Sequence, residues 1–68
     1  MDEKELKEKI YKMLDEPMTL SEIMYLCGYK PASAYFFRFK AILLELMIEK
    51  PEVKMRKSGH VWIVWREK

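Results

Sequence analysis

The sequence has little of the residue types from which disulfides, metal sites and nucleophilic active sites are built. It contains one cysteine, Cys27, and one histidine, His60. A lone cysteine forms no internal disulfide, and one Cys with one His falls short of the ligand set of a structural zinc site. The two residues lie in separate predicted elements without an acid to orient them, and there is no glycine-rich phosphate loop. We therefore expect no enzyme, no metal or other cofactor, and no small-molecule ligand.

Long apolar runs and linkers are also missing. No stretch approaches the roughly 18 apolar residues of a membrane span, and the first residues are charged where a signal peptide would be apolar. A single cysteine fits a reducing compartment. We therefore expect a soluble, cytoplasmic protein with no membrane partner. No repeat or low-complexity segment divides the 68 residues, so residues 1–68 are expected to form a single small domain.

Residues 30–50 form the longest segment with helical periodicity, and the rest of the chain is expected to frame it. Its predicted core stripe recurs at helical spacing and comprises Tyr35, Phe39, Ile42, Leu43 and Leu46. The alternative phase would expose more apolar area. The preferred phase turns Phe37, Ala41 and Leu44 outward.

Two shorter helices are predicted before this segment. Residues 2–16 carry an apolar stripe and should end before Pro17, because a proline disfavours helical geometry in the preceding residue. The sequence Thr19-Leu20-Ser21-Glu22 matches a capping box and should begin a short second helix. Its predicted apolar side consists of Ile23, Leu26 and Cys27. Gly28 is placed to end it in a left-handed conformation, and either Pro31 or Ser33 then opens the long helix.

A β-hairpin is predicted after Pro51, with strands at residues 52–57 and 60–66. If Ser58 and Gly59 form a two-residue loop, Val53 lies opposite Val64 and Met55 lies opposite Trp62. Alternation then places these four residues on one face, the expected core face. Lys54 and Arg56 point to the other face.

Charge is distributed unevenly, although the net charge is only +2. Residues 1–16 hold four Lys against six acids, whereas residues 50–68 hold six Lys or Arg against two Glu. Within residues 30–40 there are three basic residues and no acid. If the long helix and the hairpin adjoin in space, a continuous cationic face results.

The order of a helix, a short capped helix, a tight turn, a long helix and a β-hairpin resembles the winged helix-turn-helix family. Residues 19–28 resemble its positioning helix and turn, and residues 41–50 resemble the end of its recognition helix and the strand after it. The resemblance extends over residues 3–66. It implies an α+β fold, a small winged helix-turn-helix with three helices followed by a β-hairpin wing.

The same resemblance implies binding of double-stranded DNA by the third helix and the wing, as in a transcriptional regulator. The helix residues expected to face DNA are Lys30, Ser33, Phe37, Arg38 and Lys40. The wing residues expected to contact phosphate are Lys54, Arg56, Lys57 and His60. Arg38 is the candidate for a bidentate contact with guanine, or else for a phosphate contact. A homodimer is expected, since many helix-turn-helix proteins bind palindromes as dimers.

Two alternatives remain open from the sequence. The outward residues Phe37, Ala41 and Leu44 are apolar where a DNA-reading helix usually carries polar side chains, so this face is a candidate protein interface. The chain would then be a winged-helix interaction subunit of a replication or transcription assembly. In the second alternative, Trp65 stacks on bases of single-stranded nucleic acid, whereas Trp62 is expected in the core.

Overall fold

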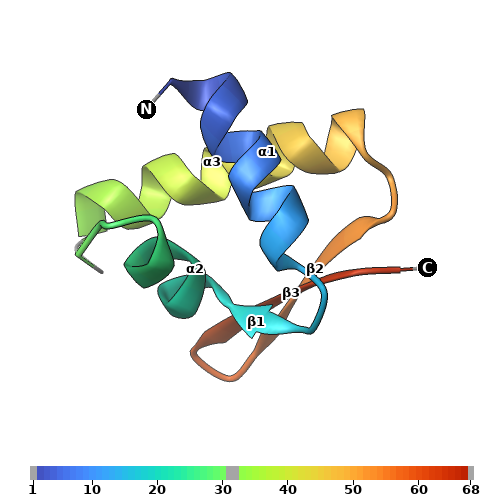
Figure 1. Ribbon diagram of the computed structural model, residues 1–68. Coiled ribbons are helices and arrows are strands. Elements are labelled where there is room, and N and C mark those ends of the chain that lie inside the picture. Colours follow the sequence, from blue (N-terminus) through green and yellow to red (C-terminus); the bar gives the residue numbers. More distant parts are fainter. Residues whose placement is uncertain (1, 31–32, 68) are drawn as a thin grey trace.

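The computed structural model describes residues 2–30 and 33–67, and the side chain of Ser33 lies outside the described part. The elements in chain order are α1 (Glu3–Met13), β1 (Met18–Thr19), α2 (Leu20–Leu26), α3 (Ser33–Glu49), β2 (Val53–Ser58) and β3 (Val61–Arg66). The strands form an antiparallel sheet in the order β1-β3-β2 (Figure 1). The α+β prediction is confirmed, and the arrangement is consistent with a small winged-helix-like fold.

The first helix begins at a side-chain cap and ends earlier than predicted. The Asp2 carboxylate accepts a hydrogen bond from the Glu5 N–H at 2.8 Å, which satisfies one of the unpaired amides of the first turn. The helix ends at Met13 and not at residue 16, because the Leu14 N–H donates to the Tyr11 carbonyl and Leu14 turns into the core.

The capping box of the second helix is confirmed. The Thr19 hydroxyl accepts from the Glu22 N–H at 3.1 Å, and the Glu22 carboxylate accepts from the Thr19 N–H at 3.2 Å. Gly28 follows the helix with a φ of 83°, the left-handed conformation expected of it. The predicted apolar side was partly wrong, since Leu26 is exposed while Met24 is buried. The inward stripe of this short helix starts at Leu20, and Leu26 falls outside it.

The predicted phase of the third helix is confirmed. Four of its five stripe residues are buried, namely Phe39, Ile42, Leu43 and Leu46. Tyr35 is the exception and is exposed, because Tyr29 from the preceding turn packs edge-on against both Tyr35 and Phe39 and takes the position above the core. The helix is described from Ser33, and the proposed start at Pro31 lies outside the described residues.

The hairpin was predicted with the correct faces and the wrong register. Its loop consists of Gly59 and His60, so Ser58 pairs with Val61 and Met55 pairs with Val64. Gly59 has a φ of 64° and His60 has no positive φ, as in a turn that needs glycine at its first central position. The difference moves each partner by two positions, which preserves the side-chain alternation. The expected core face is therefore confirmed.

Strand β1 was not among the predicted strands. Met18 pairs with Val64 and Thr19 pairs with Ile63, which places β3 in the centre of the sheet. Helices and sheet enclose one core to which every element but β1 contributes a fully buried side chain. In the described part of the chain, no helix combines the length and apolar character that crossing a membrane requires.

Candidate nucleic-acid interface

One basic residue of α3 and one of the hairpin meet at Trp62. The Nζ atom of Lys40, on α3, lies 4.2 Å from the centroid of the Trp62 ring, and the Nζ atom of Lys57, on β2, lies 5.8 Å from it. Lys57 is also the residue that pairs with Trp62 across the hairpin. The long helix and the hairpin therefore adjoin at this point, with one cation from each. We call these three residues the Trp62 cluster.

A cleft of about 250 Å³ lies at the tip of the hairpin, next to the Trp62 cluster. It lies between the start of α2, the Phe36 side chain of α3 and the segment from His60 to Trp62. Figure 1 shows the hairpin tip on the same side of the molecule as α2. His60 is exposed there, so an imidazole and the first turn of α2 border the same hollow.

The remaining wing cations lie on the opposite face of the sheet. In the register of the hairpin, Lys54 pairs with Trp65 and Arg56 pairs with Ile63. These positions alternate with Met55 and Lys57, whose side chains face the helices. Arg56 is exposed and Lys54 is half-buried. The wing thus carries positive charge on both faces, with only Lys57 on the side of α3.

Arg38 does not join the Trp62 cluster, although it is exposed on the same helix. By helical spacing it shares a flank with Glu45 and Glu49, seven and eleven positions on. Both carboxylates bind Lys7 of α1, so this flank faces α1, and Lys40 lies on the other flank. Of the other predicted helix residues, Lys30 is exposed in the turn before α3. Ser33 opens the helix, but its side chain lies outside the described part.

An apolar ridge runs along the outer face of α3. Phe37 is 69% exposed, Leu44 is 47% exposed, and Ala41 between them is also exposed. Ile48, which the sequence interpretation omitted, continues the ridge and is 81% exposed. Its place was visible in the sequence, since it lies four positions after Leu44. We call Phe37, Ala41, Leu44 and Ile48 the α3 ridge.

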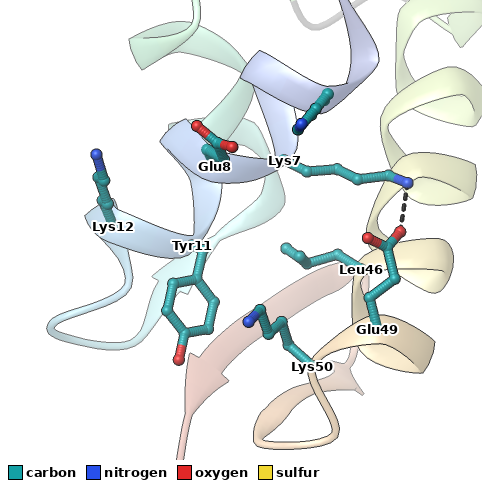
Figure 2. A pocket seen from close by; sticks show the side chains of 8 residues that line it. Lys7, Glu8, Tyr11, Lys12, Leu46, Glu49 and Lys50 are labelled. Atoms are coloured by element: carbon teal, nitrogen blue, oxygen red, sulfur yellow. Dashed lines mark hydrogen bonds and ion pairs between the residues drawn. The ribbon is translucent and has the colours of Figure 1, made fainter.

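A second cleft, of about 290 Å³, lies between α1 and the end of α3 and is lined by several lysines (Figure 2). Lys7 reaches across it and binds the carboxylates of Glu45 and Glu49. The hydrogen bond from Lys7 to Glu49 is the main reason that the pKa of Lys7 is raised above its ordinary value. Lys7 therefore remains charged and joins α1 to α3.

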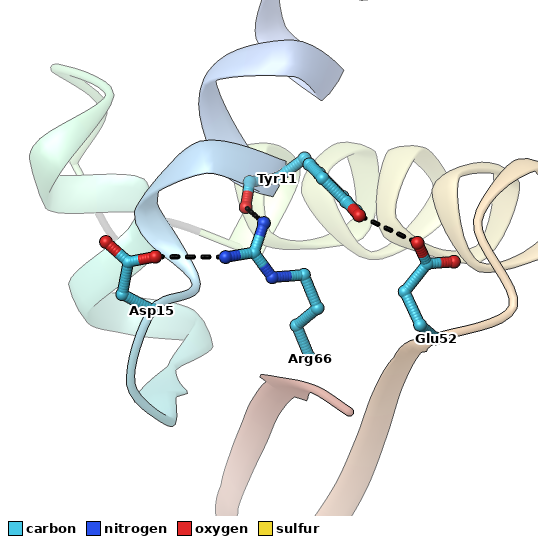
Figure 3. A network of polar contacts seen from close by, with 4 residues as sticks. All are labelled: Tyr11, Asp15, Glu52 and Arg66. Atoms are coloured by element: carbon cyan, nitrogen blue, oxygen red, sulfur yellow. Dashed lines mark hydrogen bonds and ion pairs between the residues drawn. The ribbon is translucent and has the colours of Figure 1, made fainter. Parts of the chain in front are cut away.

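Arg66 belongs to a polar network around Tyr11, which also lines this cleft (Figure 3). Its guanidinium donates to the Tyr11 carbonyl at 3.1 Å and to the Asp15 carboxylate at 2.9 Å. The Tyr11 hydroxyl donates to the Glu52 carboxylate at 2.7 Å. Arg66 was counted with the basic end of the chain, but it holds β3 against α1 and is turned away from the wing tip.

The Tyr11–Glu52 hydrogen bond shifts the pKa of both partners. It lowers the pKa of Glu52, with a smaller contribution from a backbone hydrogen bond, and it raises the pKa of Tyr11, to which burial also contributes. Cys27 is half-buried, and burial raises the pKa of its thiol, which disfavours the reactive thiolate. Within residues 2–30 and 33–67, no group of three or more His, Cys, Asp or Glu side chains is arranged to bind a metal ion.

Six of the nine predicted contact residues fall into three groups. Lys40 and Lys57 come together with His60 nearby, Lys54 and Arg56 lie on the far face of the sheet, and Arg38 lies on the flank of α3 that faces α1.

Comparisons of the chain with protein-family models, with curated proteins and with solved structures found no match.

Proposed function

We propose that this protein binds double-stranded DNA through the hairpin and the adjoining flank of α3. The observation that carries the proposal is the Trp62 cluster, in which cations of the helix and of the wing share one aromatic platform. An ammonium group that rests over an indole ring keeps its positive charge and is held in place by the ring. Two such groups, from different elements, offer phosphate oxygens a pair of fixed cationic partners.

Two further cations of the wing extend this surface. His60 lies at the tip, and Lys54 and Arg56 lie on the outer face of the sheet, so a wing placed on a sugar–phosphate backbone has cations on both of its faces. Neutralising phosphates releases counterions and supplies affinity for any sequence. These features support contacts with the sugar–phosphate backbone of DNA. The role that we propose for this binding is transcriptional regulation.

Because the α3 ridge is apolar, we place the flank of α3 that carries Lys40 toward DNA, and not the outer face of the helix. Base edges in the major groove present hydrogen-bond donors and acceptors. The side chains of Phe37, Leu44 and Ile48 have no group that pairs with them, and a base edge that loses water without gaining a partner costs free energy. Arg38 lies on the flank of α3 opposite Lys40, so this orientation turns it away from the DNA bases.

The test is fluorescence anisotropy of a labelled random duplex at about 50 and 200 mM salt, conditions between which phosphate-dependent affinity falls steeply. The test variant is Lys40→Gln with Lys57→Gln. The matched control is Lys4→Gln with Lys9→Gln, which removes the same charge from exposed positions on α1. We expect wild type and control to bind alike, and the test variant to bind more weakly, with a salt slope reduced by about one for each phosphate that is no longer neutralised.

Two results would contradict the proposal. Absence of duplex binding at low salt would exclude it, and equal losses in both double variants would show that binding depends only on net charge. The same titration with a single strand tests the alternative that Trp65 stacks on bases. A preference for the single strand that is lost in Trp65→Leu would replace duplex binding with single-strand binding.

A further inference from the structure

We propose that the α3 ridge is the contact between two copies of this chain, packed with their α3 helices antiparallel. The ridge carries three large apolar side chains that the folded chain leaves uncovered, with Ile48 at 81%, Phe37 at 69% and Leu44 at 47% exposure. Its four residues recur at the spacing of a continuous helical stripe. Contiguous exposed apolar surface of this kind is characteristic of interaction sites.

The order of residues along the ridge selects a second copy as the occupant. Phe37 and Ile48 lie equally far from the midpoint between Ile42 and Leu43, and so do Ala41 and Leu44. A two-fold axis through that midpoint therefore places Phe37 against Ile48 of the second copy, and Ala41 against Leu44 of the second copy. Each contact is made twice, as an isologous interface requires.

Side-chain sizes favour the antiparallel over the parallel arrangement. In the antiparallel pair the small Ala41 lies opposite the large Leu44, so the layers along the interface differ less in volume than in a parallel pair. In a parallel pair Ala41 would face Ala41 of the second copy, which would leave a gap between the Phe37 and Leu44 layers. Gaps forfeit dispersion contacts on both sides, and antiparallel helices also oppose their dipoles favourably.

Charges beside the ridge match in the same arrangement. Antiparallel helices related by a two-fold axis bring the same flank of each copy together. Arg38 then lies between Glu45 and Glu49 of the second copy, and both pairs occur twice. Glu45 binds Lys7 at 3.0 Å and its side chain keeps 56% exposure, so it can accept a second cation. Opposite charges at such flanking positions set the orientation of paired helices.

The expected association is weak. The 17 residues of α3 span about 25 Å, and a single pair of helices of this length buries less than the roughly 1,200 Å² at which stable interfaces begin. We therefore expect a dissociation constant on the order of micromolar to tens of micromolar. At higher concentrations most of the protein should be dimeric.

Sedimentation equilibrium of the full chain, without nucleic acid, tests the proposal. The test variant is Ile48→Lys, and the matched control is Tyr25→Lys, which changes an equally prominent side chain of α2 that is 77% exposed. We expect wild type and Tyr25→Lys to show the same monomer–dimer equilibrium, and Ile48→Lys to remain monomeric. Circular dichroism of each variant establishes that it is folded, which separates a disrupted interface from an unfolded chain.

The orientation is tested by charge reversal. Arg38→Glu and Glu45→Arg should each weaken self-association about tenfold, since exposed ion pairs are removed and like charges take their place. An equimolar mixture of the two variants should recover the wild-type affinity, because each copy then meets an opposite charge. Lys7 keeps Glu49 as a partner in Glu45→Arg.

A wild type that stays monomeric up to about 500 µM, far above the expected range, would overturn the proposal and leave the ridge to a different protein. Dimerisation that Tyr25→Lys abolishes and Ile48→Lys preserves would also overturn it. Failure of the charge-reversed mixture to associate better than its components would exclude the antiparallel orientation. Because none of these measurements includes DNA, their outcome is independent of the proposed DNA binding.

Discussion

The Nζ atom of Lys40 rests 4.2 Å from the centroid of the Trp62 ring and thereby connects the third helix to the hairpin. Trp62 is half-buried against the core, so the ring has one part in the protein interior and another beneath the lysine. This contact bears on stability as well as on the placement of charge.

Replacing Lys40 by Met should lower the free energy of unfolding by about 0.5–1 kcal/mol. Methionine retains an apolar stem over the ring and removes only the charge. Urea denaturation followed by circular dichroism measures the difference. Lys4→Met, on the exposed face of α1, is the control and should change stability little. Equal effects of the two substitutions would show that the contact with Trp62 does not stabilise the fold.

Two phenylalanines that lie two positions apart on α3 should differ sharply. Phe39 is fully buried, and Phe39→Ala should cost about 3–5 kcal/mol, a large share of the stability of so small a domain. Phe37 is 69% exposed, and Phe37→Ala should stay within about 0.5 kcal/mol. Thermal unfolding at submicromolar concentration, below the expected dissociation constant for self-association, compares them. Similar losses would refute the assignment of the outer face.

The contribution of the capping box to stability should be measurable by removal of the Thr19 hydroxyl. Thr19→Ala removes the acceptor for the Glu22 N–H and should cost about 0.5–2 kcal/mol. Ser21→Ala is the control, because Ser21 is exposed within the same helix and alanine is the better helix former. Denaturant midpoints should separate the two variants. A Thr19→Ala protein as stable as wild type would exclude a stabilising role of the cap.

Stability should fall in acid because of Glu52. The hydrogen bond from the Tyr11 hydroxyl lowers the pKa of Glu52 in the folded state. The unfolded chain therefore binds a proton at higher pH than the folded chain does. The stabilisation is fully present above the ordinary glutamate pKa, about 4.3, and is lost as pH falls through the lower folded-state value.

This pH dependence can be measured by thermal unfolding between about pH 2 and 7, a range that spans the carboxylate pKa values. Glu52→Gln should flatten the acid side of the profile. Glu16→Gln removes an exposed carboxylate outside the Tyr11–Glu52 pair and should leave the profile close to that of wild type. An unchanged slope in Glu52→Gln would contradict the role of this hydrogen bond.

Local patterns in the sequence were sufficient for much of the fold. The capping box at Thr19, the left-handed Gly28 and the inward stripe of α3 involve residues that are near one another in the chain, where backbone geometry and helical periodicity act directly. The face of the hairpin was predictable for the same reason. The register of the hairpin was not predictable, because the sequence fits two different turns. Gly59 can be the second residue of a Ser58–Gly59 loop or the first residue of a Gly59–His60 loop, and the chain adopts the latter.

The candidate site was less accessible from the sequence. Lys40 and Lys57 contact the same Trp62 ring because of the way α3 and the hairpin pack together. The hydrogen bonds of Arg66 to Tyr11 and Asp15 likewise depend on tertiary packing. These partners come from different elements of the fold, and no local pattern relates them. A charge count therefore includes Arg66 in the basic C-terminal segment, whereas its hydrogen bonds hold it beside Tyr11 and Asp15.

The central position of β3 has a consequence for how the chain folds. β1 and β2 each pair with β3 and not with each other, so the sheet closes only when Met18 meets Val64, across most of the described chain. The helices and the hairpin can form early from neighbouring residues, but this closure carries a large loop entropy and comes late. Folding should accordingly be limited by the docking of the second half of the chain onto the first.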